Sequence, residues 1–189
     1  MTLIGNDLRA LVADSAFIFV GRLLSRDMEK DARGLLVTRN RFAVERVIVG
    51  QPDVKTITLT VLGGETDTLV MRVSHMPEFA VDQRYIVFTD LARTVYNPVT
   101  ANEHGVFVIA DTAVYAYDGR AVTGVENGIL QFGATRLDIR TGRVAETSAS
   151  SDAAKLTGNI VSMERAPAAA ENPVRLEEFI AVIAAAARR

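Results

Sequence analysis

Two histidines, His75 and His104, are the side chains best suited to acid–base chemistry near neutral pH. A serine–histidine–carboxylate site needs three groups within hydrogen-bond reach, and Ser74 is the nearest hydroxyl in sequence to either histidine. The histidines fall in different expected loops, and the chain has no Gly-x-Ser-x-Gly elbow to expose a nucleophile. We therefore assign no catalytic residue and expect no catalysis. An enzyme whose site is hidden from sequence spacing remains the alternative.

Metal binding has weak support in the sequence. The chain has no cysteine and no His-Glu-x-x-His motif, so no zinc site is predicted. Met71, His75 and Met76 form a soft-ligand cluster able to hold copper. Met71 shares one face of an expected strand with Leu69 and Val73, which favours core packing instead. We predict no metal and no cofactor.

Four residues are candidate binding residues. Arg39 and Arg41 share the outward face of the strand expected at 36–49, and Thr38 and Asn40 lie on the other side. OB-type barrels bind oligonucleotides on such faces, but these also use exposed aromatic side chains, and the chain has no Trp. A solvated strand face is the favoured interpretation.

His75 and Phe79 complete the set. His75 lies in an expected loop, and Phe79 ends a Pro-Glu-Phe segment. This segment either displays the ring to a partner or plugs the end of a barrel, and the second arrangement is favoured.

Composition narrows the class of protein. The 189 residues are 49% hydrophobic and 23% charged with a net charge of -2, which is typical of a folded globular chain and disfavours nucleic-acid binding. No apolar run approaches the roughly 20 residues that cross a bilayer, so we expect no membrane span. Residues 1–7 have no basic segment before an apolar core, and no signal peptide is predicted in them.

The strand expected at 36–49 changes sidedness along its length. Its apolar face moves from even positions such as Phe42 to odd positions such as Val47. A period-2 pattern changes phase only through an extra residue, which predicts a β-bulge near Glu45 and Arg46. Bulged long strands are typical of small closed barrels.

Turn signals organise the rest of the chain. Further strands are expected at 16–24, 57–61, 69–73, 85–91 and 106–109. Residues 112–146 form a predicted β-meander, because Asp118-Gly119, Asn127-Gly128 and Thr141-Gly142 fall at nearly even spacing and suit tight hairpins.

Helices are predicted at both ends of the chain. A short helix is expected over 6–14 with Asn6 as N-cap, and residues 147–173 are expected to be a flexible linker. Residues 174–189 are expected to form an amphipathic helix, capped by Asn172 with Pro173 at the first helical position. This helix packs on the barrel or binds a partner. The predicted fold is mainly β with peripheral α, an OB-like closed β-barrel domain over 1–146.

Three segments carry a family resemblance: 42–50, 57–64 and 77–88. Their succession resembles an uncharacterised group of secreted bacterial β-proteins and, more distantly, netrin-like modules related to tissue inhibitors of metalloproteinases. The resemblance implies a five-stranded OB-type barrel and export from the cytoplasm. The inhibitor modules act through an N-terminal cysteine, which this chain lacks, so that mechanism is not carried over. Glycine is usual in the bacterial group where this chain has Asp82 or Gln83.

The sequence and its resemblance together predict a non-catalytic, extracytoplasmic binding or protein-interaction module whose partner is a protein or an envelope component. A cytoplasmic location is the alternative. A hydrolytic or metal-dependent enzyme and an OB-type oligonucleotide binder are the alternative functions. An enzyme requires His75 or His104 to meet a carboxylate in a pocket, and an oligonucleotide binder requires further basic residues beside Arg39 and Arg41.

Overall fold

The computed structural model describes residues 6–91, 96–139, 143–146 and 172–188. Its elements, in chain order, are α1 (Leu8–Ala13), β1 (Phe17–Lys30), β2 (Leu36–Val49), β3 (Thr56–Leu62), β4 (Gly64–Glu65), β5 (Val70–Met71), β6 (Arg84–Thr89), the 3-10 helix η2 (Asn102–Gly105), β7 (Val106–Ala110), β8 (Ala113–Ala116), β9 (Arg120–Glu126), β10 (Ile129–Asp138), β11 (Arg143–Glu146) and α2 (Leu176–Ala187). The fold is mainly β with a helix toward each end, as predicted.

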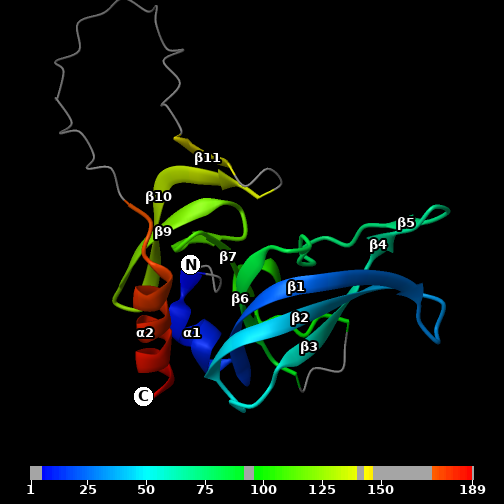
Figure 1. Ribbon diagram of the computed structural model, residues 1–189, viewed down its shortest axis with the longest axis horizontal. Helices are drawn as coiled ribbons and strands as arrows, with labels where there is room; N and C mark the ends of the chain where they lie inside the picture. Colours follow the sequence, from blue (N-terminus) through cyan, green and yellow to red (C-terminus); the bar gives the residue numbers. More distant parts are fainter. Residues whose placement is uncertain (1–5, 92–95, 140–142, 147–171, 189) are drawn as a thin grey trace, which may run out of the picture.

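Nine strands of the described residues form one antiparallel sheet in the order β11-β10-β9-β8-β7-β6-β1-β2-β3. Strands that follow one another in the chain pair, except that β6 returns beside β1. The predicted meander is therefore present as β8 to β11. Strands β4 and β5 form a separate hairpin that projects beside the far ends of β1 and β2 (Figure 1). We call this hairpin, residues 64–71, the arm.

The predicted bulge in the second long strand is present. Val20 of β1 lies opposite Arg46 of β2, and the next residue, Gly21, lies opposite Val44. Glu45 is therefore an extra residue in β2, which reverses the sidedness of the strand. The prediction of a bulge near Glu45 is confirmed.

The prediction of a closed OB-like barrel is wrong. Among the described residues the sheet ends in β3 at one edge and β11 at the other, and no pairing joins the two. Closure requires the first and last strands to meet in register, which depends on the tilt and stagger of every strand between them. A bulge supplies curvature, but it does not supply this long-range pairing.

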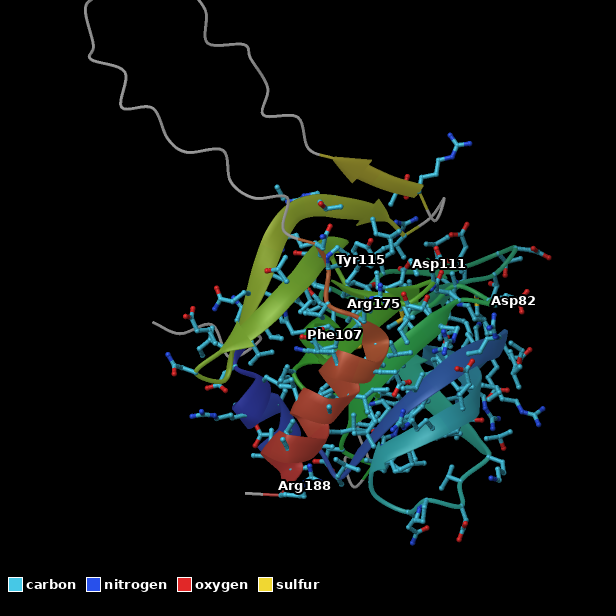
Figure 2. The ribbon with its side chains drawn as sticks, turned by 60° about the vertical axis from the view of Figure 1, so that its left-hand side comes forward. Asp82, Phe107, Asp111, Tyr115, Arg175 and Arg188 are labelled. Atoms are coloured by element: carbon cyan, nitrogen blue, oxygen red, sulfur yellow. The ribbon has the colours of Figure 1, made fainter. Side chains whose placement is uncertain are left out.

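The sheet packs on both faces. One core joins α1 and α2 to inward side chains of the central strands, and the ring of Phe107 lies 5.1 Å from that of Phe179 in α2. Figure 2 shows Phe107 beside α2, whose two ends are marked by the labelled cap residues Arg175 and Arg188. The other core lies on the opposite face and is centred on the aromatic rings of β1, β2 and β6 and of the loop before β6.

Two of the three predicted tight turns fall in the described residues. Asn127 and Gly128 both have positive φ, as a type I′ hairpin requires. At the β8–β9 turn only Gly119 has positive φ, and a Cβ there would lie 2.2 Å from the carbonyl oxygen of Leu137. The third turn, at Thr141-Gly142, lies outside the described residues.

Helix α1 begins one residue later than predicted. Asp7 is its N-cap, and its carboxylate accepts a hydrogen bond from the backbone N–H of Ala10 at 3.1 Å. The predicted apolar face of Leu8, Leu11 and Val12 is buried.

Helix α2 packs on the sheet, and its predicted face is buried: Leu176, Phe179, Ile180 and Ile183. The predicted cap at Asn172 is wrong, because the residues before the helix pair with the sheet. Arg175 forms a bridge with Ala113, and the backbone N–H of Val174 donates to Val122. The chain therefore stays extended up to Leu176.

Most of the predicted linker lies outside the described residues. No helix in the described part of the chain is long and apolar enough to span a bilayer.

Candidate functional site

The four predicted binding residues do not form one site. Arg39 and Arg41 are exposed on the outward face of β2, and Arg39 forms an ion pair of 3.2 Å with Glu29. Other exposed arginines are also neutralised, as at the Arg46–Glu177 ion pair. Carboxylates thus neutralise part of the positive charge that an oligonucleotide binder requires.

Phe79 is buried in the second core and is 2% exposed. Its ring makes edge contacts at 5.1 Å with Phe42 and with Tyr85. The backbone on either side is held by two tyrosine hydroxyls: the N–H of Glu78 donates to Tyr117 at 2.8 Å, and the N–H of Ala80 donates to Tyr85 at 2.7 Å. The ring is therefore part of the core and is not displayed to a partner. The expected place for it, the end of a closed barrel, is absent because the described strands form an open sheet.

His75 does meet a carboxylate. Its Nδ1 lies 2.9 Å from Oε1 of Glu103 in η2, and its backbone has a positive φ of 62°. The contact lies at the surface, because the His75 side chain is 71% exposed. His104 lines a different hollow, a small one of about 170 Å³ that also includes Glu103 and Tyr117. Among the described residues no three potential metal ligands of the His, Cys, Asp or Glu type gather.

A second region emerges from the structure, between the arm and the inner face of β1 and β2. We call it the arm cleft. Its outer recess has a volume of about 410 Å³ and is lined by Arg26, Met28, Gly64, Glu65, Val70, Met71, Arg72 and Glu78. Its inner pocket of about 80 Å³ shares five of these residues and adds Thr38, Asn40, Val61, Leu62, Gly63, Val73, Met76 and Pro77. Three methionines thus line one cleft.

A bulge in β1, one of three register shifts between β1 and β2, turns the β1 side chains into the cleft. Leu23 lies opposite Phe42, but Ser25 lies opposite Arg41, so Leu24 is an extra residue in β1. Beyond this bulge the even positions of β1 face inward. Arg26 then lies opposite Asn40, and Met28 lies opposite Thr38, on the same face of the strand pair.

Two glycines bring the arm close to the sheet. The Thr38 hydroxyl donates to the carbonyl oxygen of Gly63 at 2.6 Å, and the N–H of Gly63 donates to Leu36 at 2.8 Å. Gly63 and Gly64 have φ of 97° and 153°, and a Cβ on Gly64 would lie 2.6 Å from Thr38 Oγ1. Only glycine combines a positive φ with such a close approach of the backbone to a neighbouring atom.

Asn40 is a buried polar residue with a free acceptor. It is 1% exposed, and its Nδ2 donates to the carbonyl oxygens of Thr38 at 3.4 Å and Leu59 at 3.3 Å. These two acceptors fix the amide orientation, since only the NH₂ end can donate to them. The Oδ1 atom therefore points away from them and has no hydrogen-bond partner among the described residues.

Arg26 provides a matching free donor. Its Nε is buried and also lacks a hydrogen-bond partner in the described part of the chain, where no carboxylate forms an ion pair with it. Burial raises the pKa of Tyr85 to about 12 and also raises that of Tyr117, so both nearby hydroxyls are neutral at neutral pH. The charge of Arg26 is therefore not balanced by these tyrosines.

The arm cleft has the chemistry of a binding site. Arg26 lies opposite Asn40 in the register of β1 and β2, and both residues line the inner pocket, so an acceptor and a donor without partners among the described residues belong to the same pocket. The described lining contains no His, and no nucleophile–base pair lies there. A bound group that both accepts and donates hydrogen bonds would satisfy both atoms.

One sequence signal could have indicated this site. Thr38 and Asn40 fall on the inward side of β2, between apolar positions at Leu36 and Phe42. Polar residues on a buried strand face break the expected pattern, and such breaks are typical of functional sites. The inward direction of Arg26 was not visible, because it depends on the bulge at Leu24.

Comparison with known proteins yields no relative: no protein family, no curated protein and no solved structure matches the chain.

Proposed function

We propose that the protein is a non-catalytic binding module and that the arm cleft holds its ligand. The observation that supports the proposal most is Asn40, which lines the inner pocket and whose buried Oδ1 has no hydrogen-bond partner among the described residues. A buried polar atom without a partner costs about 1 to 3 kcal/mol of folding stability. A ligand that donates to Oδ1 would recover this cost when it binds.

The resemblance to secreted bacterial proteins supports a location outside the cytoplasm. On this proposal the ligand belongs to another protein or to an envelope component. The cleft favours recognition of a flexible segment, because methionine side chains adapt to ligands of different shape.

The test is a titration of ¹⁵N-labelled protein with three small probes: N-methylacetamide, acetate and isopropanol. At least one of them should shift the backbone amide signals of Asn40 and Gly64 in a saturable manner. The Asn40→Leu and Arg26→Met variants should lose these shifts, whereas Arg41→Met, which changes an arginine of the outward face, should keep them. Shifts confined to other surfaces, or shifts unchanged in both cleft variants, would refute the proposal.

A second candidate function is hydrolysis at the His75–Glu103 pair, favoured by the 2.9 Å contact between the two side chains. A carboxylate that orients a histidine is the usual arrangement of a general base. If the pair is catalytic, His75→Gln and Glu103→Gln should each reduce the hydrolysis of p-nitrophenyl acetate by about 100-fold or more. Our leading proposal expects the unmodified protein to match the buffer rate.

A further inference from the structure

We infer that the arm cleft binds the carboxyl terminus of a peptide chain: the carboxylate at Arg26 and the last peptide N–H at Asn40 Oδ1. This inference rests on the proposed function and specifies its ligand. The juxtaposition that carries it is a buried acceptor without a hydrogen-bond partner in the same pocket as an arginine without an ion pair, both judged among the described residues.

Arg26 differs from the other described arginines in its buried Nε, which has no hydrogen-bond partner among the described residues. Five described arginines pair with carboxylates: Arg22, Arg39, Arg46, Arg84 and Arg120. Arg26 and Arg72 have no such pair among the described residues, although Glu65 and Glu78 line the same cleft. Arginine binds carboxylates with two parallel hydrogen bonds, so an unpaired arginine in a recess suits an incoming carboxylate.

Asn40 indicates which kind of carboxylate ligand fits the cleft. Its free atom is an acceptor, so a simple carboxylate satisfies Arg26 and leaves Oδ1 without a donor. In the last residue of a peptide the N–H and the carboxylate are attached to the same carbon. One such residue therefore reaches two side chains that face each other across a strand pair.

The volumes of the two parts of the cleft suit the terminal groups of the peptide and its last side chain. The inner pocket, about 80 Å³, holds the volume of roughly two or three water molecules, which suits a carboxylate and its neighbouring N–H. The outer recess, about 410 Å³, has room for the terminal side chain against Met28 and Met71. The methionines favour an unbranched apolar side chain, because thioethers pack closely around flexible groups.

The experiment compares three forms of one peptide, N-acetyl-Ala-Ala-Met, by NMR titration of the full chain. The first form has a free carboxylate, the second has a terminal amide, and the third has an ester oxygen in place of the last peptide N–H. The free acid should bind at the arm cleft. The amide and the ester should each bind roughly 10-fold or more weakly, since each lacks one charge-assisted or buried hydrogen bond.

Substitutions in the cleft test which residue recognises each group of the peptide. Asn40→Leu should remove the preference for the peptide N–H while keeping the preference for the free carboxylate. Arg26→Gln should do the reverse, and Arg72→Gln, at a residue that lines both parts of the cleft, should weaken binding of the free acid. Arg41→Gln is the matched control and should leave all three affinities unchanged.

The outcomes separate the inference from the proposed function. If the small probes bind at the cleft but the three peptides bind equally, or none binds, the inference is wrong and the proposed function stands. If neither the probes nor the peptides bind at the cleft, both are wrong.

Discussion

Asn40 occupies a strand position where the local pattern requires an apolar side chain. Its NH₂ group donates two long hydrogen bonds, and its Oδ1 accepts none from the described residues. The neighbouring inward residue, Thr38, is also polar and buried, but its hydroxyl donates to Gly63. Both side chains are therefore buried. They differ in hydrogen bonding, because the Thr38 hydroxyl has a partner and Asn40 Oδ1 has none among the described residues.

We expect Asn40→Leu to change the free energy of unfolding by less than about 0.5 kcal/mol, because removal of a buried acceptor without a partner among the described residues offsets the loss of the two long hydrogen bonds from Nδ2. Thr38→Val should lower it by about 1 kcal/mol, because it breaks a satisfied hydrogen bond. Urea unfolding followed by circular dichroism measures both. A loss of stability in Asn40→Leu equal to that in Thr38→Val would show that Oδ1 has a partner in the folded chain.

The buried hydroxyl of Tyr85 leads us to expect that folding stability depends on pH. Burial raises its pKa from an ordinary value of 10.0 to about 12 in the folded chain. Between these values the unfolded chain loses the phenolic proton and the folded chain keeps it, so stability falls as pH rises from about 10 to about 12. The total loss from this group is about 3 kcal/mol.

We expect Tyr85→Phe to flatten the dependence of stability on pH above about pH 10, as measured by urea unfolding at a series of pH values. The variant also leaves the N–H of Ala80 without its acceptor, which lowers stability by about 1 kcal/mol at neutral pH. An unchanged slope above pH 10 would contradict burial of this hydroxyl.

At the scale of elements, the arm depends on the glycine pair that connects it to β3. Gly63 and Gly64 adopt positive φ and lie against Met71 and Thr38 respectively. The arm has few backbone pairs of its own, since β4 and β5 share only the register Gly64–Met71 and Glu65–Val70. Its position over the cleft is therefore set mainly at its base.

We expect Gly64→Ala to lower the free energy of unfolding by about 1 to 3 kcal/mol, because the new Cβ meets Thr38 Oγ1 and the backbone φ is unfavourable for alanine. The matched control is Gly124→Ala in β9, where a Cβ meets nothing within 4 Å and φ is ordinary. Amide hydrogen exchange at Glu65 should accelerate in the first variant alone. Equal stabilities for the two variants would contradict a close approach of the arm to β2.

The long strands show how much of an element the sequence determines. The phase change in β2 predicts the bulge at Glu45 correctly, because sidedness is a local property of a strand. The pattern of β1 is apolar on both faces near Phe17–Val20, and it hides a second kind of bulge, which places the extra residue, Leu24, in β1 itself. The inward direction of Arg26 follows from that bulge, so this half of the candidate site was not predictable.

At the scale of the molecule, α1 and α2 cover one face of the sheet. On the other face, side chains of the strands pack against one another and against Phe79 in the loop before β6. Helix α2 contributes four buried apolar side chains to the first core. In the described residues the sheet ends in the unjoined edge strands β3 and β11, which distinguishes this fold from the predicted closed barrel.

We expect Phe179→Ala to lower the free energy of unfolding by about 3 to 5 kcal/mol, because Phe179 is fully buried and its ring contacts Phe107. Glu178→Ala, at an exposed position of the same helix, should change it by less than about 0.5 kcal/mol. Thermal unfolding compares the two. A small effect of Phe179→Ala would mean that α2 is not part of the cooperative core.

The sequence by itself determined the features that depend on neighbouring residues: the mainly β class, the bulge at Glu45, the Asn127-Gly128 turn and the buried faces of α1 and α2. Periodicity and turn chemistry act over a few residues, so one chain is sufficient to read them. Only the tertiary structure decided that the sheet stays open and that Arg26 lies opposite Asn40 under the arm. Strand closure and the meeting of side chains across a sheet depend on the register of distant segments, which no local pattern encodes.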